Sequence, residues 1–213
     1  MAALALDQIF RYRLRRVLEV ANMRTHIATD LHDDIGANLT RIALLSEVAK
    51  RTKGDGPLEA IATIARESVG AMSDIVWAVN PKRETLRDLT RRMRQHADEL
   101  FTQRGIQLRF TGPADDTRRL SMDVRRDVLL VFKEAVNNAA RHAGCTAVDI
   151  SLRVDQGQLA LAIVDDGVGF DSTGESEGNG LASMQRRAAR LRGTLRVERH
   201  SPSGTLVSLS VPL

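Results

Sequence analysis

The stretch KEAVNNAARHA, residues 133–143, carries the polar side chains on which the interpretation of the fold depends. Glu134, Asn138 and Arg141 are spaced by four and three residues, so on a helix they lie near one face, with His142 beside them. A carboxamide oxygen such as that of Asn138 is a hard ligand that suits Mg²⁺, and basic side chains nearby suit phosphates. The polar face of a surface helix has the same pattern, so the stretch alone leaves both interpretations open.

A second stretch, VDDGVGF at residues 164–170, follows apolar residues that are typical of a strand. A carboxylate at a strand end, such as that of Asp165, can accept a hydrogen bond from an exocyclic amine of a ligand. Gly167 and Gly169 lack side chains, which allows the backbone to approach a ligand closely. An ordinary Asp-Gly turn has the same composition, so this stretch is also compatible with a purely structural role.

A third stretch, GNGLASMQRRAARL at residues 178–191, begins with glycines and continues with helix-forming residues. Glycines that open a helix, here Gly178 and Gly180, leave main-chain N–H groups that can bind a phosphate. The spacing is not the G-x-G-x-x-G of dinucleotide-binding proteins, no strand leads directly into it, and it has no Walker A lysine. The stretch therefore indicates an anion site that belongs to neither of those classes.

The N-terminal part is predicted to be a helical hairpin. Apolar residues recur at steps of three and four over residues 27–48 and again over 58–79, which is the period of an amphipathic helix. The stretch TKGDGP at 52–57 separates the two helices, and the Asn-Pro pair at 80–81 ends the second. One hairpin cannot bury both apolar stripes but two can, so we predict a homodimer through a four-helix bundle of residues 10–80.

The remainder of the chain mixes helices with strands. The predicted helices cover 84–103, 123–143 and the segment up to about 191, and the predicted strands cover 106–110, 147–154, 159–166, 194–199 and 205–211. This mixture predicts an α/β sandwich with helices on one face of a mixed sheet. The fold class is therefore α+β, with a dimerisation hairpin at residues 1–82, a sandwich domain at 83–213 and a hinge near 80–84.

Composition limits the classes of protein to consider. The 213 residues are 43% hydrophobic and 27% charged, as in ordinary globular proteins, and the net charge is +4. Arginines cluster at 11–16 and at 87–94. Aromatic residues make up only 3% of the chain and do not interleave with these clusters, so we expect no direct nucleic-acid binding. The single cysteine, Cys145, excludes an internal disulfide and a cysteine-cluster metal site and fits a reducing cytosol. No apolar run approaches the roughly 20 residues of a membrane span, so we expect a cytoplasmic chain that meets a membrane only through a sensory segment absent from it.

In this order, the three polar stretches resemble the N, G1 and G2 boxes of the ATP-binding domain shared by histidine kinases, gyrase, the Hsp ninety chaperone and mismatch-repair ATPases. The stretch SGTLVSLSVPL at residues 203–213 is similar to the final strand of that domain in kinases, with Gly204-Thr205 as its last glycine box. The resemblance implies a site for ATP with Mg²⁺ as the cofactor.

The resemblance also implies a role for each residue of the site. Asn138 would hold Mg²⁺, Asp165 would bind the adenine amine, and Glu134 would position water or the metal. Arg141 and His142 would lie near the phosphates. The other nucleotide-binding residues that it implies belong to the glycine boxes: Gly167, Gly169, Gly178, Gly180, Leu181 and Thr205.

The stretch TDLHDDIGANLTRI at residues 29–42 resembles the phosphoacceptor box of the NarX/DesK-like class of sensor histidine kinases, and DIVWAVNPKRETLRDL at 74–89 is also similar to members of that class. The likeness implies ATP-dependent autophosphorylation on His32, followed by transfer to an aspartate of a response regulator receiver domain. His32 lies about 100° round the helix from the apolar Leu31, so it is predicted to face outward. The carboxylate of Asp33 is placed either to accept the Nδ1 proton while Nε2 attacks or to fix the tautomer of the ring.

Ala37 departs from the pattern of this class. Members that dephosphorylate their regulator usually have glutamine five residues after the histidine, so we expect phosphatase activity to be weak or absent. Two other interpretations stay open. A protein-serine kinase or regulatory ATPase of the same superfamily would need no His32, and a structural coiled-coil dimer with a degenerate nucleotide domain would not bind an ATP analogue with Mg²⁺.

Overall fold

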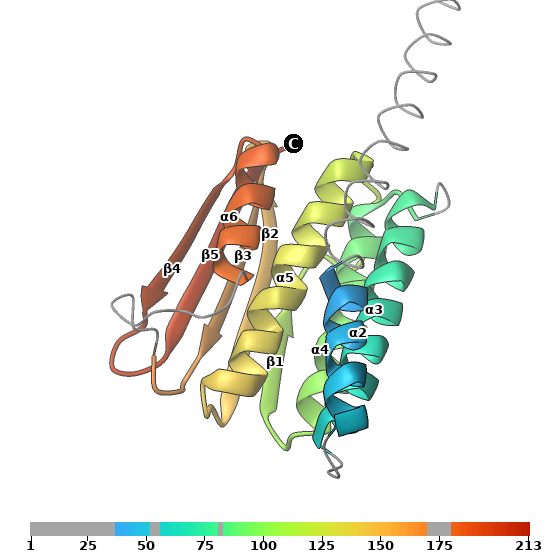
Figure 1. The fold of residues 1–213 in the computed structure, drawn as a ribbon. Coiled ribbons are helices and arrows are strands. Elements are labelled where there is room, and N and C mark those ends of the chain that lie inside the picture. Colours follow the sequence, from blue (N-terminus) through green and yellow to red (C-terminus); the bar gives the residue numbers. More distant parts are fainter. Residues whose placement is uncertain (1–36, 52–55, 81–82, 170–179) are drawn as a thin grey trace, which may run out of the picture. The chain divides into compact units, whose positions relative to one another are not determined.

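The computed structural model describes residues 37–51, 56–80, 83–169 and 180–213 (Figure 1). The chain divides into two compact units, Met1–Val79 and Asn80–Leu213. Three predicted site residues, His32, Asp33 and Gly178, lie outside the described residues. Within the described ranges, no helix has the length and apolar character needed to cross a membrane.

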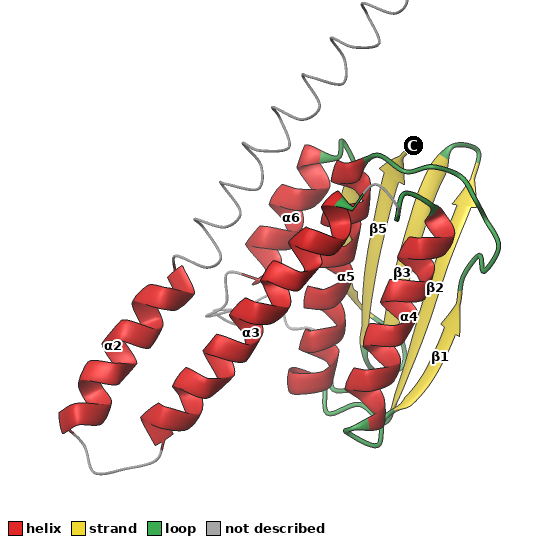
Figure 2. Ribbon diagram, turned by 90° about the vertical axis from the view of Figure 1, so that its right-hand side faces the viewer, coloured by secondary structure: helices red, strands yellow, loops and turns green. Residues whose placement is uncertain are grey.

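Within the described residues of the first unit, the helices α2 (Ala37–Arg51) and α3 (Gly56–Val79) lie side by side as a hairpin (Figure 2). Helix α3 begins earlier than the predicted break at 52–57 allows, because Pro57 lies in its first turn, where the missing N–H needs no partner. The hairpin leaves large apolar side chains exposed on both helices. They are Leu39, Leu44, Val48, Leu58, Val69, Met72 and Val76.

The second unit is a five-stranded sheet covered by helices on one face (Figures 1 and 2). The helices are α4 (Leu86–Thr102), α5 (Met122–His142) and α6 (Gly180–Arg190), and the strands are β1 (Gln107–Thr111), β2 (Ala147–Asp155), β3 (Gln158–Asp165), β4 (Thr194–Arg199) and β5 (Thr205–Pro212). The strand order is β1-β2-β3-β5-β4, with β1 parallel to β2 and the other pairs antiparallel. The predicted α+β class, with helices on one face of a mixed sheet, is confirmed.

The core of the second unit lies between the sheet and the helices that cover it. Alternate residues of β2 and β3 are buried, because successive side chains of a strand point to opposite faces. They are Val148, Ile150 and Leu152 on β2 and Leu159, Leu161 and Ile163 on β3. On α4 and α5, buried residues recur at helical spacing instead, and Phe101 and Phe132 fill the largest volumes among the apolar ones. This apolar layer fixes α5, which carries Glu134, Asn138, Arg141 and His142 of the predicted site, against the sheet.

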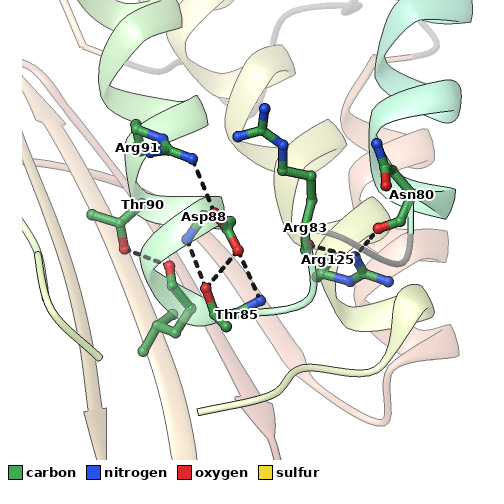
Figure 3. Close-up of polar contacts among 8 residues, drawn as sticks. Asn80, Arg83, Thr85, Asp88, Thr90, Arg91 and Arg125 are labelled. Atoms are coloured by element: carbon green, nitrogen blue, oxygen red, sulfur yellow. Dashed lines mark hydrogen bonds and ion pairs between the residues drawn. The ribbon is translucent and has the colours of Figure 1, made fainter. Parts of the chain in front are cut away.

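The segment that opens the second unit is ordered by a capping box (Figure 3). The hydroxyl of Thr85 accepts a hydrogen bond from the amide of Asp88 at 3.2 Å, and the Asp88 carboxylate accepts one from the amide of Thr85 at 3.3 Å. Burial acts to raise the pKa of Asp88, but the hydrogen bonds from Thr85 outweigh it, so this pKa lies below its ordinary value. The start of α4 is therefore fixed by local chemistry.

Arg125, near the start of α5, fastens the residues that precede this cap (Figure 3). Its Nη1 donates to the main-chain oxygen of Asn80 at 3.3 Å and also to that of Arg83. Burial lowers the pKa of the Arg125 guanidinium, as expected for a cation that lies among carbonyl oxygens rather than in water. Two residues of the predicted hinge near 80–84 are thus bonded to α5 within the second unit.

Candidate functional site

The carboxylate of Asp165 lies at the end of β3 and is 5% exposed. Its Oδ1 accepts hydrogen bonds from the amides of Gly167, at 3.0 Å, and Thr205, at 3.1 Å. Within the described residues, no hydrogen bond involves Oδ2. Two amides therefore fix the orientation of the carboxylate and leave one oxygen to accept a bond from a ligand N–H.

The glycines around Asp165 are required by close backbone packing. A Cβ added to Gly167 would overlap the carbonyl oxygen of Ala143, at the end of α5. Gly204 has a φ of 107°, and a Cβ there would overlap the carbonyl oxygen of Asp165. At Gly167, the space that a side chain would need is filled by the backbone of Ala143. The turn after β3 therefore packs directly on α5 and on the connection between β4 and β5.

Asp166 has a different role from its neighbour. Its exposed carboxylate accepts hydrogen bonds from the amide of Thr146 at 2.7 Å, the hydroxyl of Thr146 at 2.6 Å and the amide of Ala147 at 2.9 Å. These bonds, led by that from the hydroxyl, hold the pKa of Asp166 below its ordinary value. Asp166 thus links the end of β3 to the start of β2, and its carboxylate oxygens accept hydrogen bonds from within the protein.

Glu134 of α5 and Gly180, the first residue of α6, come from two motifs 46 positions apart and meet in the structure. A Cβ added to Gly180 would overlap Glu134 Oε1, so the carboxylate lies directly against the start of α6. A helix N-terminus carries a partial positive charge, which favours a carboxylate there. Leu181, the next residue of α6, is half-buried.

The other predicted residues lie further along α5. Asn138 is one turn beyond Glu134 and is half-buried, whereas Arg141 and His142 are exposed in the last turn. Gly169 lies in the turn after β3 with a φ of 87°. The second unit therefore brings the described residues of the N and G2 boxes together through Glu134 and Gly180, and those of the G1 and last boxes together at Asp165.

The donor set on α5 can be compared with the needs of a metal. No group of three or more His, Cys, Asp or Glu side chains in the described ranges could hold an ion. Mg²⁺ keeps several waters and binds proteins through one or two hard oxygen ligands together with substrate phosphates. A carboxylate and an amide oxygen one helical turn apart, on Glu134 and Asn138, fit that requirement.

Two protein families match the chain. Residues 123–213 match the family described as histidine kinase-, DNA gyrase B-, and HSP90-like ATPase, and residues 24–103 match the family described as histidine kinase. The first match contains every described residue of the predicted nucleotide site. The second contains His32 and Asp33. The two matches follow one another along the chain with 19 residues between them, 104–122.

Curated relatives share the same span. The signal transduction histidine-protein kinase/phosphatase UhpB of Salmonella typhimurium is 30% identical over 204 residues, which cover 92% of this chain and 40% of UhpB. The nitrate/nitrite sensor protein NarQ of Escherichia coli is 31% identical over 199 residues, covering 88% of this chain and 34% of NarQ. The chain thus spans less than half the length of these relatives.

Solved structures show the same fold. The blue-light activated histidine kinase EL346 of Erythrobacter litoralis superposes with a TM-score of 0.59 and 21% identity, covering 87% of this chain and 59% of that one. The histidine kinase AdeS of Acinetobacter baumannii has a TM-score of 0.56 and 17% identity, covering 86% and 96%.

Proposed function

Since the chain belongs to the sensor histidine kinases of the NarQ and UhpB kind, we propose that it uses ATP to phosphorylate its own His32 and then passes the phosphoryl group to a response regulator. One observation carries the proposal: a histidine kinase match containing His32 precedes an ATPase match in which Asp165 is oriented with Oδ2 open to a ligand. A regulatory ATPase of the superfamily has no need of the first match.

The second unit would bind ATP through residues on α5, β3 and β5. Asp165 accepts the exocyclic amine of adenine on Oδ2, while its Oδ1 keeps the two amides. Arg141 and His142, both exposed at the end of α5, attract the phosphates. Glu134 and Asn138 would hold Mg²⁺, which when bound neutralises phosphate charge.

Phosphoryl transfer then requires a nucleophile with a free electron pair. Neutral imidazole has one on Nε2, which attacks the γ-phosphorus as the bond to the β–γ bridging oxygen breaks and ADP leaves. The Nδ1 proton passes to the carboxylate of Asp33, which removes the positive charge from the ring. The phosphoryl group moves next to an aspartate carboxylate of a receiver domain as the N–P bond breaks, and the proton held by Asp33 returns to the ring, which restores neutral His32.

A homodimer through the hairpin is part of the proposal. On α3, the exposed apolar residues Val69, Met72 and Val76 are spaced by three and four and form one stripe. On α2, Leu44 and Val48 are one turn apart and exposed as well. Monomeric proteins rarely leave such stripes in water, and two hairpins would cover them as a four-helix bundle.

Some members of this class also dephosphorylate their regulator, and we propose that Ala37 makes this chain a poor phosphatase. We expect the chain to shorten the lifetime of a phosphorylated receiver domain little or not at all, because alanine cannot orient a water. Replacement of Ala37 by glutamine should shorten that lifetime. The lifetime is followed after removal of ATP, with a receiver domain that the kinase has itself phosphorylated.

The deciding experiment compares the unaltered chain with His32→Gln and His200→Gln after incubation with γ-labelled ATP. His200 is exposed in the connection between β4 and β5, so it controls for loss of any histidine. We expect acid-labile label on the unaltered chain and on His200→Gln, and none on His32→Gln, while all three bind an ATP analogue. Acid-stable label that persists on His32→Gln would instead indicate a protein-serine kinase.

A further inference from the structure

Helices α5 and α6 are joined by an ion pair with a fully buried carboxylate, and the site described above does not include this pair. The carboxylate of Asp127, which is 0% exposed, accepts two hydrogen bonds from Arg190, one from Nε at 2.8 Å and one from Nη2 at 2.9 Å. Nε of Arg126 also donates a hydrogen bond to Oδ1 of this carboxylate at 3.1 Å, and Nη1 of Arg187 lies 3.8 Å from the same oxygen. Asp127 therefore accepts a two-bond contact from the last turn of α6.

A second carboxylate of α5 meets the other end of α6. Glu134, seven residues after Asp127, lies against Gly180 at the start of α6. Seven residues of helix span about 10.5 Å, so the two carboxylates are separated by two turns of α5. Asp127 contacts the end of α6 and Glu134 contacts its beginning, so the two helices are aligned in opposite directions by one carboxylate at each end.

The ion pair between Asp127 and Arg190 contributes more to the orientation of α6 on α5 than to the free energy of folding. Burying charges costs solvation that their attraction largely offsets, so buried ion pairs add little net stability. A bidentate arginine–carboxylate contact, however, fixes the relative geometry of its partners. Met184 and Ala188 already supply the buried apolar contact of α6. The ion pair therefore fixes the orientation of α6 on α5, in addition to the apolar contact of Met184 and Ala188.

We propose that Asp127 and Arg190 are positioning residues for nucleotide binding. By fixing the end of α6 on α5, they set the place of Gly180 and Leu181 relative to Glu134. Neither residue belongs to the set proposed to contact the nucleotide. The inference rests on the proposed function, because Gly180, Leu181 and Glu134 matter to the reaction only if the second unit binds ATP.

A double-mutant cycle on the full chain tests the inference. It compares Asp127→Asn, Arg190→Met and the double variant, with the Kd of a fluorescent ATP analogue and Mg²⁺ as the primary measurement. Each single change should weaken binding about tenfold, and the double change also about tenfold rather than about a hundredfold, because both remove the same contact. The rate of autophosphorylation at saturating ATP should change less than about twofold.

Two further variants separate positioning from general damage. Arg196→Met removes an exposed arginine of β4 and should leave the Kd unchanged. Arg190→Lys keeps the charge but not the two-bond geometry, so its Kd should fall between those of the unaltered chain and Arg190→Met. Arg190 is 35% exposed at its side chain, so the variants at this position should fold even if Asp127→Asn does not.

The possible failures are distinguishable. Absence of analogue binding by the unaltered chain would overturn the proposed function itself. An unaltered Kd in Arg190→Met, with or without a fall in melting temperature, would overturn the positioning role while the proposed function stands. Single effects that multiply in the double variant would show that Asp127 and Arg190 act independently, which also contradicts the inference.

Discussion

The Oδ1 atom of Asp165 accepts a hydrogen bond from the amide of Thr205, 40 residues later in the chain, at 3.1 Å. This bond joins the end of β3 to the start of β5, and the amide of Gly167 donates to the same oxygen at 3.0 Å. Two donors on one oxygen determine which oxygen remains for a ligand. The carboxylate is therefore both part of the fold and oriented for binding.

This arrangement predicts that a substitution of Asp165 can weaken nucleotide binding without lowering the melting temperature. Asparagine can keep its oxygen toward the two amides, but then presents an NH₂ group where the ligand amine needs an acceptor. We expect Asp165→Asn to weaken binding of an ATP analogue by tenfold or more, because a hydrogen bond involving a charged group contributes about 1.5–3 kcal/mol. Its melting temperature should stay close to that of the unaltered chain.

The matched variant is Asp165→Ala, which removes the acceptor for both amides. It should lose nucleotide affinity and melting temperature together, since two amides then lack their partner. Titration with the analogue and thermal unfolding on the same samples give both values. Equal binding by Asp165→Asn and the unaltered chain would contradict the ligand role of this carboxylate.

The adjacent Asp166 predicts a pH-dependent contribution to stability. Its pKa in the folded chain lies below the ordinary value of 3.8. The stabilisation from a depressed pKa is fully present above the unfolded value and is lost as the pH falls through the folded one. Asp166→Asn should therefore melt at a lower temperature than the unaltered chain at neutral pH, and the two should converge as the pH falls through the folded pKa of Asp166.

Asp98→Asn, which removes a carboxylate at an exposed position of α4, is the matched control. Thermal unfolding between neutral and acidic pH measures all three chains. Nucleotide affinity of Asp166→Asn should remain nearly unchanged, because its bonds go to Thr146 and Ala147. A difference from the unaltered chain that grows at low pH would contradict this account of Asp166.

The contrast between these two aspartates marks the limit of what the sequence could predict. Strands β2 and β3 were predictable because the alternation of buried residues is a local property. The functions of Asp165 and Asp166 were not separable in the same way. Their partners, Thr205 and Thr146, are 40 and 20 residues away and come close only after the sheet has formed.

Contacts between helices could not be predicted from the sequence either, because their partners are also far apart along the chain. The residues Glu134 and Gly180 were each predicted for the site, but no spacing indicated that they touch. Asp127 and Arg190 were not predicted at all, although two arginines and an aspartate at 125–127 within an apolar helix were a visible signal. A charged side chain on a buried face needs a partner, and only the packing of α6 identifies it.

Gly204 predicts a stability difference that depends on space as well as backbone conformation. Its φ of 107° disfavours any side chain, and a Cβ would also overlap the carbonyl oxygen of Asp165. Gly157 has a φ of 77° but open space around a Cβ. We expect Gly157→Ala to cost about 1 kcal/mol, and Gly204→Ala clearly more.

Denaturant unfolding of both alanine variants measures the difference. Because Gly204 packs on Asp165, its variant should also bind the ATP analogue more weakly, whereas Gly157→Ala should bind normally. Similar free energies of unfolding for the two variants would show that the connection between β4 and β5 shifts to make room, and would remove the steric account of Gly204.

The apolar stripe of α3 predicts the assembly of the chain. Val69 and Val76 are each 67% exposed and lie two turns apart on the same face. If a second hairpin covers them, burying a lysine at either position would place a charge in an apolar interface at a cost of several kcal/mol. We therefore expect the unaltered chain to sediment as a dimer at micromolar concentration and the double variant Val69→Lys/Val76→Lys to sediment as a monomer. Thr63→Lys/Arg66→Lys, at exposed polar positions of the same helix, should remain dimeric. A monomeric unaltered chain, or a dimer that survives both lysines, would place the interface elsewhere.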